Sequence, residues 1–155
     1  MTDSVLVAEH PAGDRVVGQL TLNVEKTLNS LTREMVDIIS DRLEAWAQDD
    51  NVVAVLIDGA GEKAFCAGGD VVALYNSGKE GSADWQDFFA SEYRMNAAIG
   101  AFPKPYIAFI DGVVMGGGVG VSVHGDFRIA TERTLFAMPE TCLLYTSPSP
   151  RDLAV

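Results

Sequence analysis

Two short, continuous apolar runs constrain the fold of this chain more than any other feature of its sequence. They span residues 52–57 (VVAVLI) and 106–110 (YIAFI), and an Asp-Gly pair closes each of them. A run of this length without polar alternation is typical of a strand that is covered on both faces. Residues 84–99, between the two runs, have helical spacing. A strand–helix–strand order with right-handed crossovers predicts an α/β architecture with a parallel or mixed sheet.

The first third of the chain adds a hairpin and a helix. Residues 5–8 and 15–22 are predicted to pair as a β-hairpin, because the second segment alternates and residues 11–14 (PAGD) are rich in turn formers. Thr32 is predicted to cap a helix that ends at residues 48–51. Four apolar residues recur after it at helical spacing: Met35, Ile39, Leu43 and Trp46.

The charge balance excludes two classes of partner. The 155 residues carry 22 acidic and 11 basic side chains, a net charge of −11, while 48% of the residues are hydrophobic, enough for a buried core. Nucleic acids and anionic membrane surfaces bind clusters of Lys and Arg, and the sequence has none, so we expect neither as a partner. Cys66 and Cys142 are too few for a disulfide scaffold. We expect a reducing, cytoplasmic setting, no metal ion and no cofactor.

Two glycine-rich turns follow the predicted strands, at residues 65–70 (FCAGGD) and 115–120 (MGGGVG). In an α/β sheet, ligands collect where strands end and helices begin. Two such turns facing each other could aim two backbone N–H groups at one oxygen, as in an oxyanion hole. Neither turn matches a phosphate loop or a dinucleotide fingerprint. The alternative is that both are only tight turns that allow close packing.

The residues around these turns resemble a known family. Segments 63–70 (KAFCAGGD) and 111–118 (DGVVMGGG) are similar to the two signature segments of the crotonase (enoyl-CoA hydratase/isomerase) superfamily. Segments 114–125 (VMGGGVGVSVHG) and 135–141 (LFAMPET) most resemble its 3-hydroxyisobutyryl-CoA hydrolase branch. The resemblance covers about residues 5–141. It implies a spiral α/β core of repeated ββα units, the ClpP-like fold, without the family's C-terminal helical region.

The resemblance also implies an acyl-CoA thioester substrate and a set of site residues. The backbone N–H groups of Gly69 and Gly117 would hold the thioester oxygen, and Glu140 would be the catalytic carboxylate, as a general base or as a nucleophile. Losing one oxyanion donor typically costs about 10²–10³ in rate. Lys26 would lie near the CoA phosphates. The equally supported alternative is that Lys26 is only a solvent-exposed lysine with no role in binding. The other implied substrate-binding residues are Leu28, Ala64, Ala67, Gly68 and Gly116.

Glu92 stands out on the helix predicted over residues 84–99. It lies in the middle of an apolar stripe formed by Trp85, Phe88, Met95 and Ile99. A buried carboxylate is costly unless it is paired or used. The resemblance puts the matching Glu at the acyl end of the substrate; the alternative is a rotated helix with Glu92 at its rim.

Gly120 separates the branches of the superfamily. Hydratases carry a Glu at this position and use two carboxylates, so water addition to an enoyl-CoA is disfavoured here. The resemblance therefore predicts a thioester hydrolase of the 3-hydroxyisobutyryl-CoA hydrolase branch. Three alternatives remain: an isomerase or hydratase-like enzyme, a non-catalytic acyl-CoA-binding module, and an inactive fragment, which is what we expect of the chain as given. We expect a homo-oligomer only of a full-length protein.

Residues 142–155 resemble no part of the family. Pro148 stands where the pattern would have its second catalytic Asp, and the segment is rich in Ser and Pro. We therefore divide the chain into an N-terminal part of a crotonase-fold domain, residues 1–141, and a non-native tail.

The remaining polar residues are weaker candidates. His10 is expected in a surface turn, and His124 in the core or at a helix end. Cys66 is expected to be a small buried residue and Asp70 to cap a helix that opens at Val71. Four aromatic residues are expected in the core or lining a pocket: Tyr75, Trp85, Phe88 and Phe89.

Overall fold

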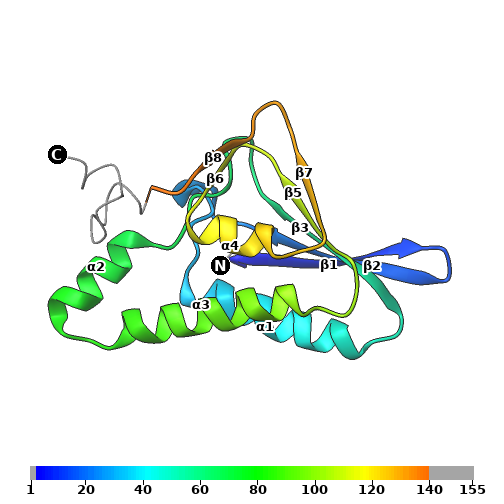
Figure 1. Cartoon of the computed structure of the whole chain (residues 1–155), viewed down its shortest axis with the longest axis horizontal. Coiled ribbons are helices and arrows are strands. Elements are labelled where there is room, and N and C mark those ends of the chain that lie inside the picture. The colour runs from blue at the N-terminus through cyan, green and yellow to red at the C-terminus, as the bar shows by residue number, and fades with distance from the viewer. Residues whose placement is uncertain (1–2, 140–155) are drawn as a thin grey trace, which may run out of the picture.

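The computed structural model describes residues 3–139 and has two sheets with helices packed against them (Figure 1). The larger sheet has five strands in the order β1-β2-β3-β5-β7. Its strands are β1 (Val5–Ala12), β2 (Arg15–Leu22), β3 (Val52–Gly59), β5 (Tyr106–Ile110) and β7 (Phe127–Ala130). β1 and β2 pair antiparallel, and every later pair is parallel. The mixed sheet and both strands predicted from the apolar runs are thus confirmed, but coverage on both faces is not, since Phe109 of β5 is 38% exposed.

The hairpin is longer than predicted. Pro11 and Ala12 belong to β1, paired with Val16 and Arg15, so the turn shrinks to two residues, with Gly13 at φ 70°. Pro11 is tolerated because β1 is an edge strand, where no neighbour needs its missing N–H group. Because β1 extends to Ala12, the prediction that His10 lies in a turn is wrong. It sits within β1, where its Nε2 lies 2.6 Å from Oε1 of Gln19.

A second sheet of three parallel strands, β4 (Ala64–Cys66), β6 (Val113–Met115) and β8 (Leu135–Ala137), lies beside the first. The three later strands of the larger sheet are each followed by one of these short strands, in the pairs β3–β4, β5–β6 and β7–β8. This repetition gives the expected ββα units. The residue patterns alone do not reveal the second sheet, because three residues are too few for a periodicity.

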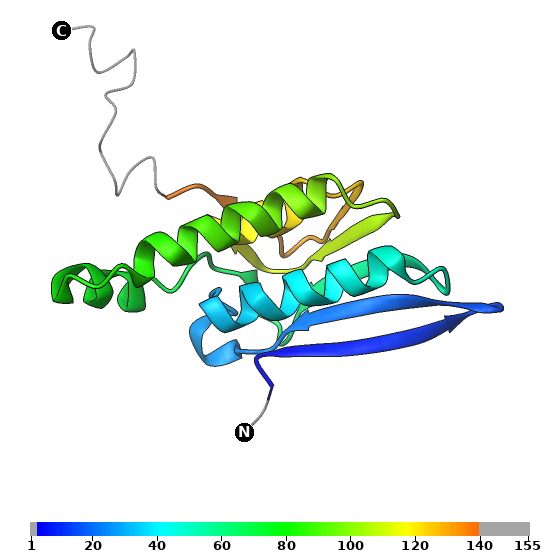
Figure 2. The same cartoon turned by 90° about the horizontal axis from the view of Figure 1, so that it is seen from below.

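Four α-helices connect the strands: α1 (Arg33–Gln48), α2 (Val71–Glu80), α3 (Asp84–Gly100) and α4 (Gly117–Val123). A short 3-10 helix, η1 (Glu25–Thr27), precedes α1. α1 and α3 run side by side over one face of the structure (Figure 2). The predicted caps are confirmed: Thr32 Oγ1 accepts from the N–H of Met35, and Asp70 Oδ1 accepts from that of Ala73. Among residues 3–139, no helix is long and apolar enough to cross a membrane.

The larger sheet packs on α1 through a contact between Gly18 of β2 and the ring of Trp46. Trp46 is 2% exposed, and its Nε1 donates to Oε1 of Glu9 at 2.9 Å. A Cβ placed on Gly18 would lie 2.7 Å from two ring carbons. The absence of a side chain at position 18 therefore lets the indole lie flat on the sheet.

We predict that Gly18→Ala lowers the free energy of unfolding by about 1–3 kcal/mol, because the indole must move out of a packed position. Urea denaturation would measure this. The matched control is Gly78→Ala in α2, where a Cβ meets nothing within 4 Å. This control should stabilise by up to about 1 kcal/mol, since Ala is the better helix former. A neutral Gly18→Ala would contradict the described packing.

Candidate active site

The two glycine-rich turns meet where β4 and β6 end. The strands pair in parallel, Ala64 beside Val113 and Cys66 beside Val114. A Cβ on Gly68 would lie 3.3 Å from the carbonyl oxygen of Met115 and 3.6 Å from the amide nitrogen of Gly117. Gly68 has φ 105° and Gly116 has φ 47°. Both values favour glycine, and they bring the two turns into contact.

The amides of Gly69 and Gly117 lie beside this contact and make no backbone–backbone hydrogen bond within residues 3–139. Gly69 forms an isolated bridge with Leu31, but its bonds run from Leu31 N to Gly68 O (2.7 Å) and from Asp70 N to Leu31 O (3.0 Å). Gly117 is the first residue of α4, so its N–H has no partner within the helix. Among residues 3–139, neither N–H group donates to a backbone carbonyl oxygen. The arrangement suits an oxyanion hole, and that role stays a prediction.

Glu92 lies next to Gly117. It is 5% exposed, so the predicted buried position on α3 is confirmed and the rim position is not observed. A Cβ on Gly117 would overlap its Oε1. Glycine at position 117 thus leaves room for the Glu92 carboxylate beside the start of α4.

Cys66 is a buried thiol, as predicted. Burial raises its pKa to about 12, and the negative charge of Glu92 adds to this, although hydrogen bonds with the backbone of Gly68 and Leu31 oppose the shift. A thiol with this pKa stays protonated at neutral pH and does not act as a nucleophile.

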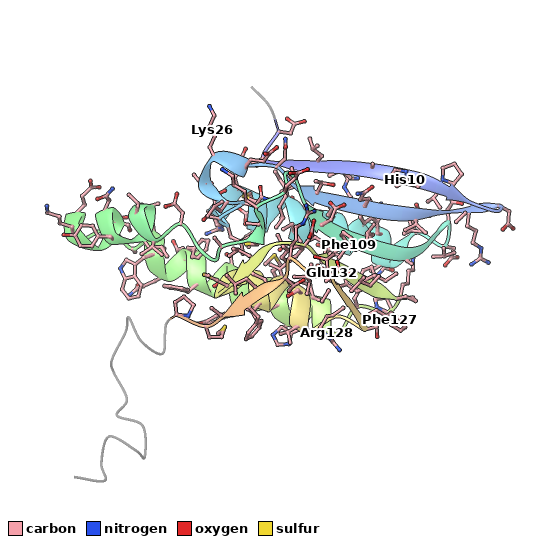
Figure 3. All side chains as sticks on the ribbon, turned by 90° about the horizontal axis from the view of Figure 1, so that it is seen from above. His10, Lys26, Phe109, Phe127, Arg128 and Glu132 are labelled. Carbon is pink, nitrogen blue, oxygen red and sulfur yellow. The ribbon has the colours of Figure 1, made fainter. Side chains whose placement is uncertain are left out.

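A cleft of about 400 Å³ is lined in part by residues 60–64, which precede the first glycine-rich turn. Lys26, Leu28 and Ala64 all line it, so three predicted CoA-binding residues share one site. Lys26 is exposed on η1 and points outward (Figure 3). The complete lining is Glu25, Lys26, Leu28, Asn29, Ala60, Gly61, Glu62, Lys63 and Ala64. Ala67 is joined to this region by its N–H, which donates to Leu28 O at 3.0 Å. Binding of CoA by these residues stays a prediction.

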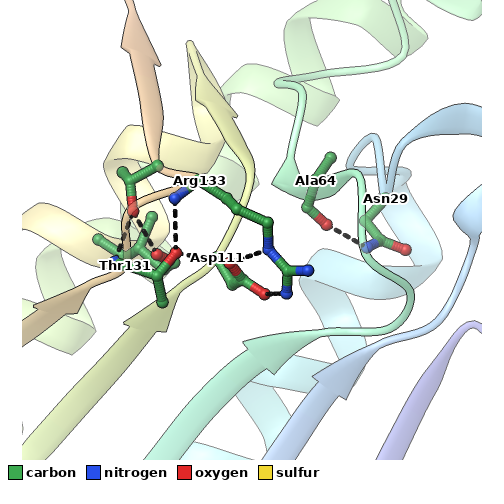
Figure 4. A network of polar contacts seen from close by, with 7 residues as sticks. Asn29, Ala64, Asp111, Thr131 and Arg133 are labelled. Carbon is green, nitrogen blue, oxygen red and sulfur yellow. Dashed lines mark hydrogen bonds and ion pairs between the residues drawn. The ribbon is translucent and has the colours of Figure 1, made fainter.

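Asn29 holds the cleft and the first glycine turn together, and the sequence analysis did not single it out. Its side chain is 1% exposed. Its Oδ1 accepts from Val24 N, and its Nδ2 donates to the carbonyl oxygens of Ala60 and Ala64, each at 2.9 Å (Figure 4). Asn29 follows Leu28, and both have left-handed backbones, φ 54° and 55°. Asn tolerates this conformation better than most residues.

Asp111 fixes the turn before β6 and was also missed. Its carboxylate accepts from Thr131 Oγ1 at 2.6 Å and from two nitrogens of Arg133 (Figure 4). The hydrogen bonds and charge of Arg133, with the bond from Thr131, lower the pKa of Asp111 to about 2. Asp111 precedes Gly112, whose carbonyl oxygen accepts from Leu135 N at 3.0 Å. The network therefore ties β6 to β8.

Several predicted residues take other places. Glu140 and residues 142–155 lie outside the described residues. His124 caps the C-terminal end of α4 and is exposed, so of the two positions expected for it only the helix end is correct. Tyr75 is 66% exposed and Trp85 38%, so the expectation of core or pocket positions is wrong for both. Tyr75 lies within α2, and Trp85 lies in the first turn of α3. Among residues 3–139, no group of acidic, His or Cys side chains is arranged to hold a metal ion.

We predict that Asn29→Ala lowers the free energy of unfolding by about 2–4 kcal/mol, because one buried and two partly buried backbone groups lose their partner. The control is Asn23→Ala, which removes a bond to Asp3 O at the surface and should cost about 1 kcal/mol or less. Equal effects of the two substitutions in urea denaturation would argue against the role of Asn29.

We predict that Asp111→Asn destabilises the chain at neutral pH and that this effect disappears in acid. The folded-state pKa of Asp111 is below its ordinary value of 3.8, so its contribution is present above that value and is lost as the pH falls toward about 2. Urea denaturation of both proteins between pH 7 and pH 2 would measure the difference. Asp37→Asn, in an exposed ion pair with Arg33, should have little effect at any pH.

Comparison with known proteins agrees with this geometry. The family model described as Enoyl-CoA hydratase/isomerase matches residues 17–146. The chain is 54% identical over 126 residues to a Gallus gallus protein named 3-hydroxyisobutyryl-CoA hydrolase, mitochondrial, and 56% identical over 124 residues to its Danio rerio namesake. These matches cover 81% and 80% of this chain. The chain spans about a third of the length of these relatives, 33% and 32%. The relatives are named as mitochondrial, so a cytoplasmic location stays a prediction.

Solved structures with the same fold also come from this family. A carnitinyl-CoA dehydratase from Mycobacterium thermoresistibile matches with a TM-score of 0.84 and 53% identity. An enoyl-CoA hydratase from Rhodobacter sphaeroides matches with a TM-score of 0.82 and 42% identity. The two matches cover 90% and 89% of this chain and 40% of each of those chains. The chain therefore belongs to the enoyl-CoA hydratase/isomerase family, the crotonase superfamily, and has part of the crotonase fold.

Proposed function

We propose that this chain provides the oxyanion-binding part of an acyl-CoA thioester hydrolase that acts on 3-hydroxyisobutyryl-CoA. The observation that carries the proposal is the contact of the two glycine turns, which places the amides of Gly69 and Gly117, neither bonded to a backbone carbonyl within residues 3–139, near buried Glu92. The names of the relatives that are more than half identical support the choice of substrate.

Hydrolysis of a thioester puts negative charge on the carbonyl oxygen. Backbone N–H groups that are already oriented stabilise this charge without giving up a proton, and they act more strongly where water is excluded. Gly69 and Gly117 belong to turns that positive-φ glycines and strand pairing hold in place. The two amides would bind the thioester oxygen, with Gly68 and Gly116 lining the approach.

Two carboxylates would act around this oxygen. Glu140, in the Met-Pro-Glu-Thr segment, would activate water or attack the carbonyl carbon, and both routes remain open. Glu92 would face the acyl end of the substrate. Cys66 is not the nucleophile, because its raised pKa keeps it protonated.

The CoA moiety would lie in the cleft lined by Lys26, Leu28 and Ala64. Lys26 and Lys63 bring two positive charges to the cleft, and these would meet the phosphates. Ala67, bonded to the carbonyl of Leu28, would link CoA binding to the oxyanion turn.

Gly120 favours hydrolysis over hydration. With glycine at this position, the second carboxylate expected of a hydratase is missing, and the amide of Asn96 occupies the space beside it. The second candidate is an enoyl-CoA hydratase or isomerase, which the names of the solved structures favour. A non-catalytic acyl-CoA-binding module is the third.

We predict that the complete gene product releases free CoA from 3-hydroxyisobutyryl-CoA and that Glu140→Ala lowers kcat at least about 100-fold, since a catalytic acid or base contributes roughly 10²–10⁴. A thiol reagent would measure the release. Glu44→Gln, an exposed residue of α1, is the control and should leave kcat unchanged.

Other results would support the rival functions. Loss of enoyl absorbance without release of CoA would indicate a hydratase or isomerase. Binding of the ester in calorimetry without turnover would indicate a binding module. Unchanged turnover in Glu140→Ala would contradict the proposed role of this carboxylate.

A further inference from the structure

Helices α3 and α4 lie against each other in a regular register. From the N-terminal end of both helices onward, the contacts join Glu92 with Gly117, Asn96 with Gly120, and Gly100 with His124. Glu92 and Asn96 are four residues apart, so they face α4 from successive turns of α3. Asn96 therefore lies one helical turn beyond the carboxylate that borders the oxyanion turn.

The side chain of Asn96 fills the space where residue 120 would have one. A Cβ on Gly120 would lie 2.5 Å from Nδ2 of Asn96 and 3.0 Å from its Cγ and Oδ1. These are the three nearest atoms. In contrast, a Cβ on Gly118 would overlap the backbone of Cys66, and Gly116 has a positive φ. At position 120, a Cβ would instead meet a side chain first, that of Asn96.

The carboxamide of Asn96 is kept in an unfavourable state. Its Oδ1 is buried and has no hydrogen-bond partner within residues 3–139. Buried acceptors are nearly always satisfied, and an exception needs a reason such as a role in binding. Asn is also a poor helix former in the interior of a helix such as α3. Packing against Gly120 does not satisfy the oxygen of this side chain, and helix propensity does not account for it.

We infer that Asn96 is a specificity-determining residue, whose carboxamide oxygen accepts a hydrogen bond from a hydroxyl group on the acyl chain of the thioester. This inference rests on the proposed function. A neutral amide suits a neutral hydroxyl donor, and it adds no negative charge beside Glu92. The thioester oxygen would lie at Gly117, and the acyl chain would extend past Glu92 toward Asn96, along the α3–α4 register.

The test compares two esters that differ only in the hydroxyl group, 3-hydroxyisobutyryl-CoA and isobutyryl-CoA. We expect the complete gene product to prefer the hydroxylated ester. Asn96→Leu, which is similar in size but has no polar atoms, should reduce the ratio of the two kcat/KM values at least about tenfold. Asn96→Ala, whose smaller side chain cannot overpack the helix contact, should also lower the ratio of the two kcat/KM values. The control is Met95→Leu on the core-facing side of α3, which should leave the ratio unchanged.

The ratio separates a binding role from a structural one. If Asn96 only supports the fold, both variants will lower kcat/KM for the two esters equally, and the inference is overturned. An unchanged ratio with full activity overturns it as well. If the unmodified protein hydrolyses neither ester, the proposed function fails rather than the assignment of Asn96 alone.

Discussion

Direct contact between backbones at the two glycine turns is the constraint on which the rest of this structure depends. A Cβ on Gly118 would overlap the carbonyl oxygen of Cys66, and one on Gly112 would overlap that of Lys63. Side chains at these positions would push β6 and α4 away from β4. Because the backbones touch, α4 begins close to the first turn, and the amide of Gly117 comes near Gly68. The same contact brings α4 against α3, and with it Glu92 and Asn96.

The sequence predicts this arrangement where a pattern is long or a residue is chemically unusual. The apolar runs predict β3 and β5, helical spacing predicts α1 and α3, and the position of Glu92 in an apolar stripe predicts its burial. The glycine-rich turns and their resemblance to the crotonase signature segments predict the family.

Other features depend on contacts between distant segments, which no local pattern encodes. The three-residue strands of the second sheet are defined only by their partners. Asn29 bonds to residues 31 and 35 positions away, and Asp111 to residues 20 and 22 positions away. Asn96 looks like an ordinary helical residue until α4 is packed beside it. The roles of the site residues, Glu140 above all, stay predictions.

Local rather than overall charge governs how this acidic chain would receive a polyanionic ligand. The net charge of −11 opposes CoA at long range. That repulsion is screened beyond about 8 Å at physiological salt, so the side chains of the cleft determine the interaction with a bound ligand. Lys26 and Lys63 share the cleft with Glu25 and Glu62, which makes its formal charge balanced. A balanced cleft attracts phosphate only weakly, so apolar contacts with Leu28 and Ala64 and the hydrogen bonds to the thioester would have to supply much of the affinity. Recognition at the acyl end, where Glu92 and Asn96 lie, then gains weight in choosing one thioester over another.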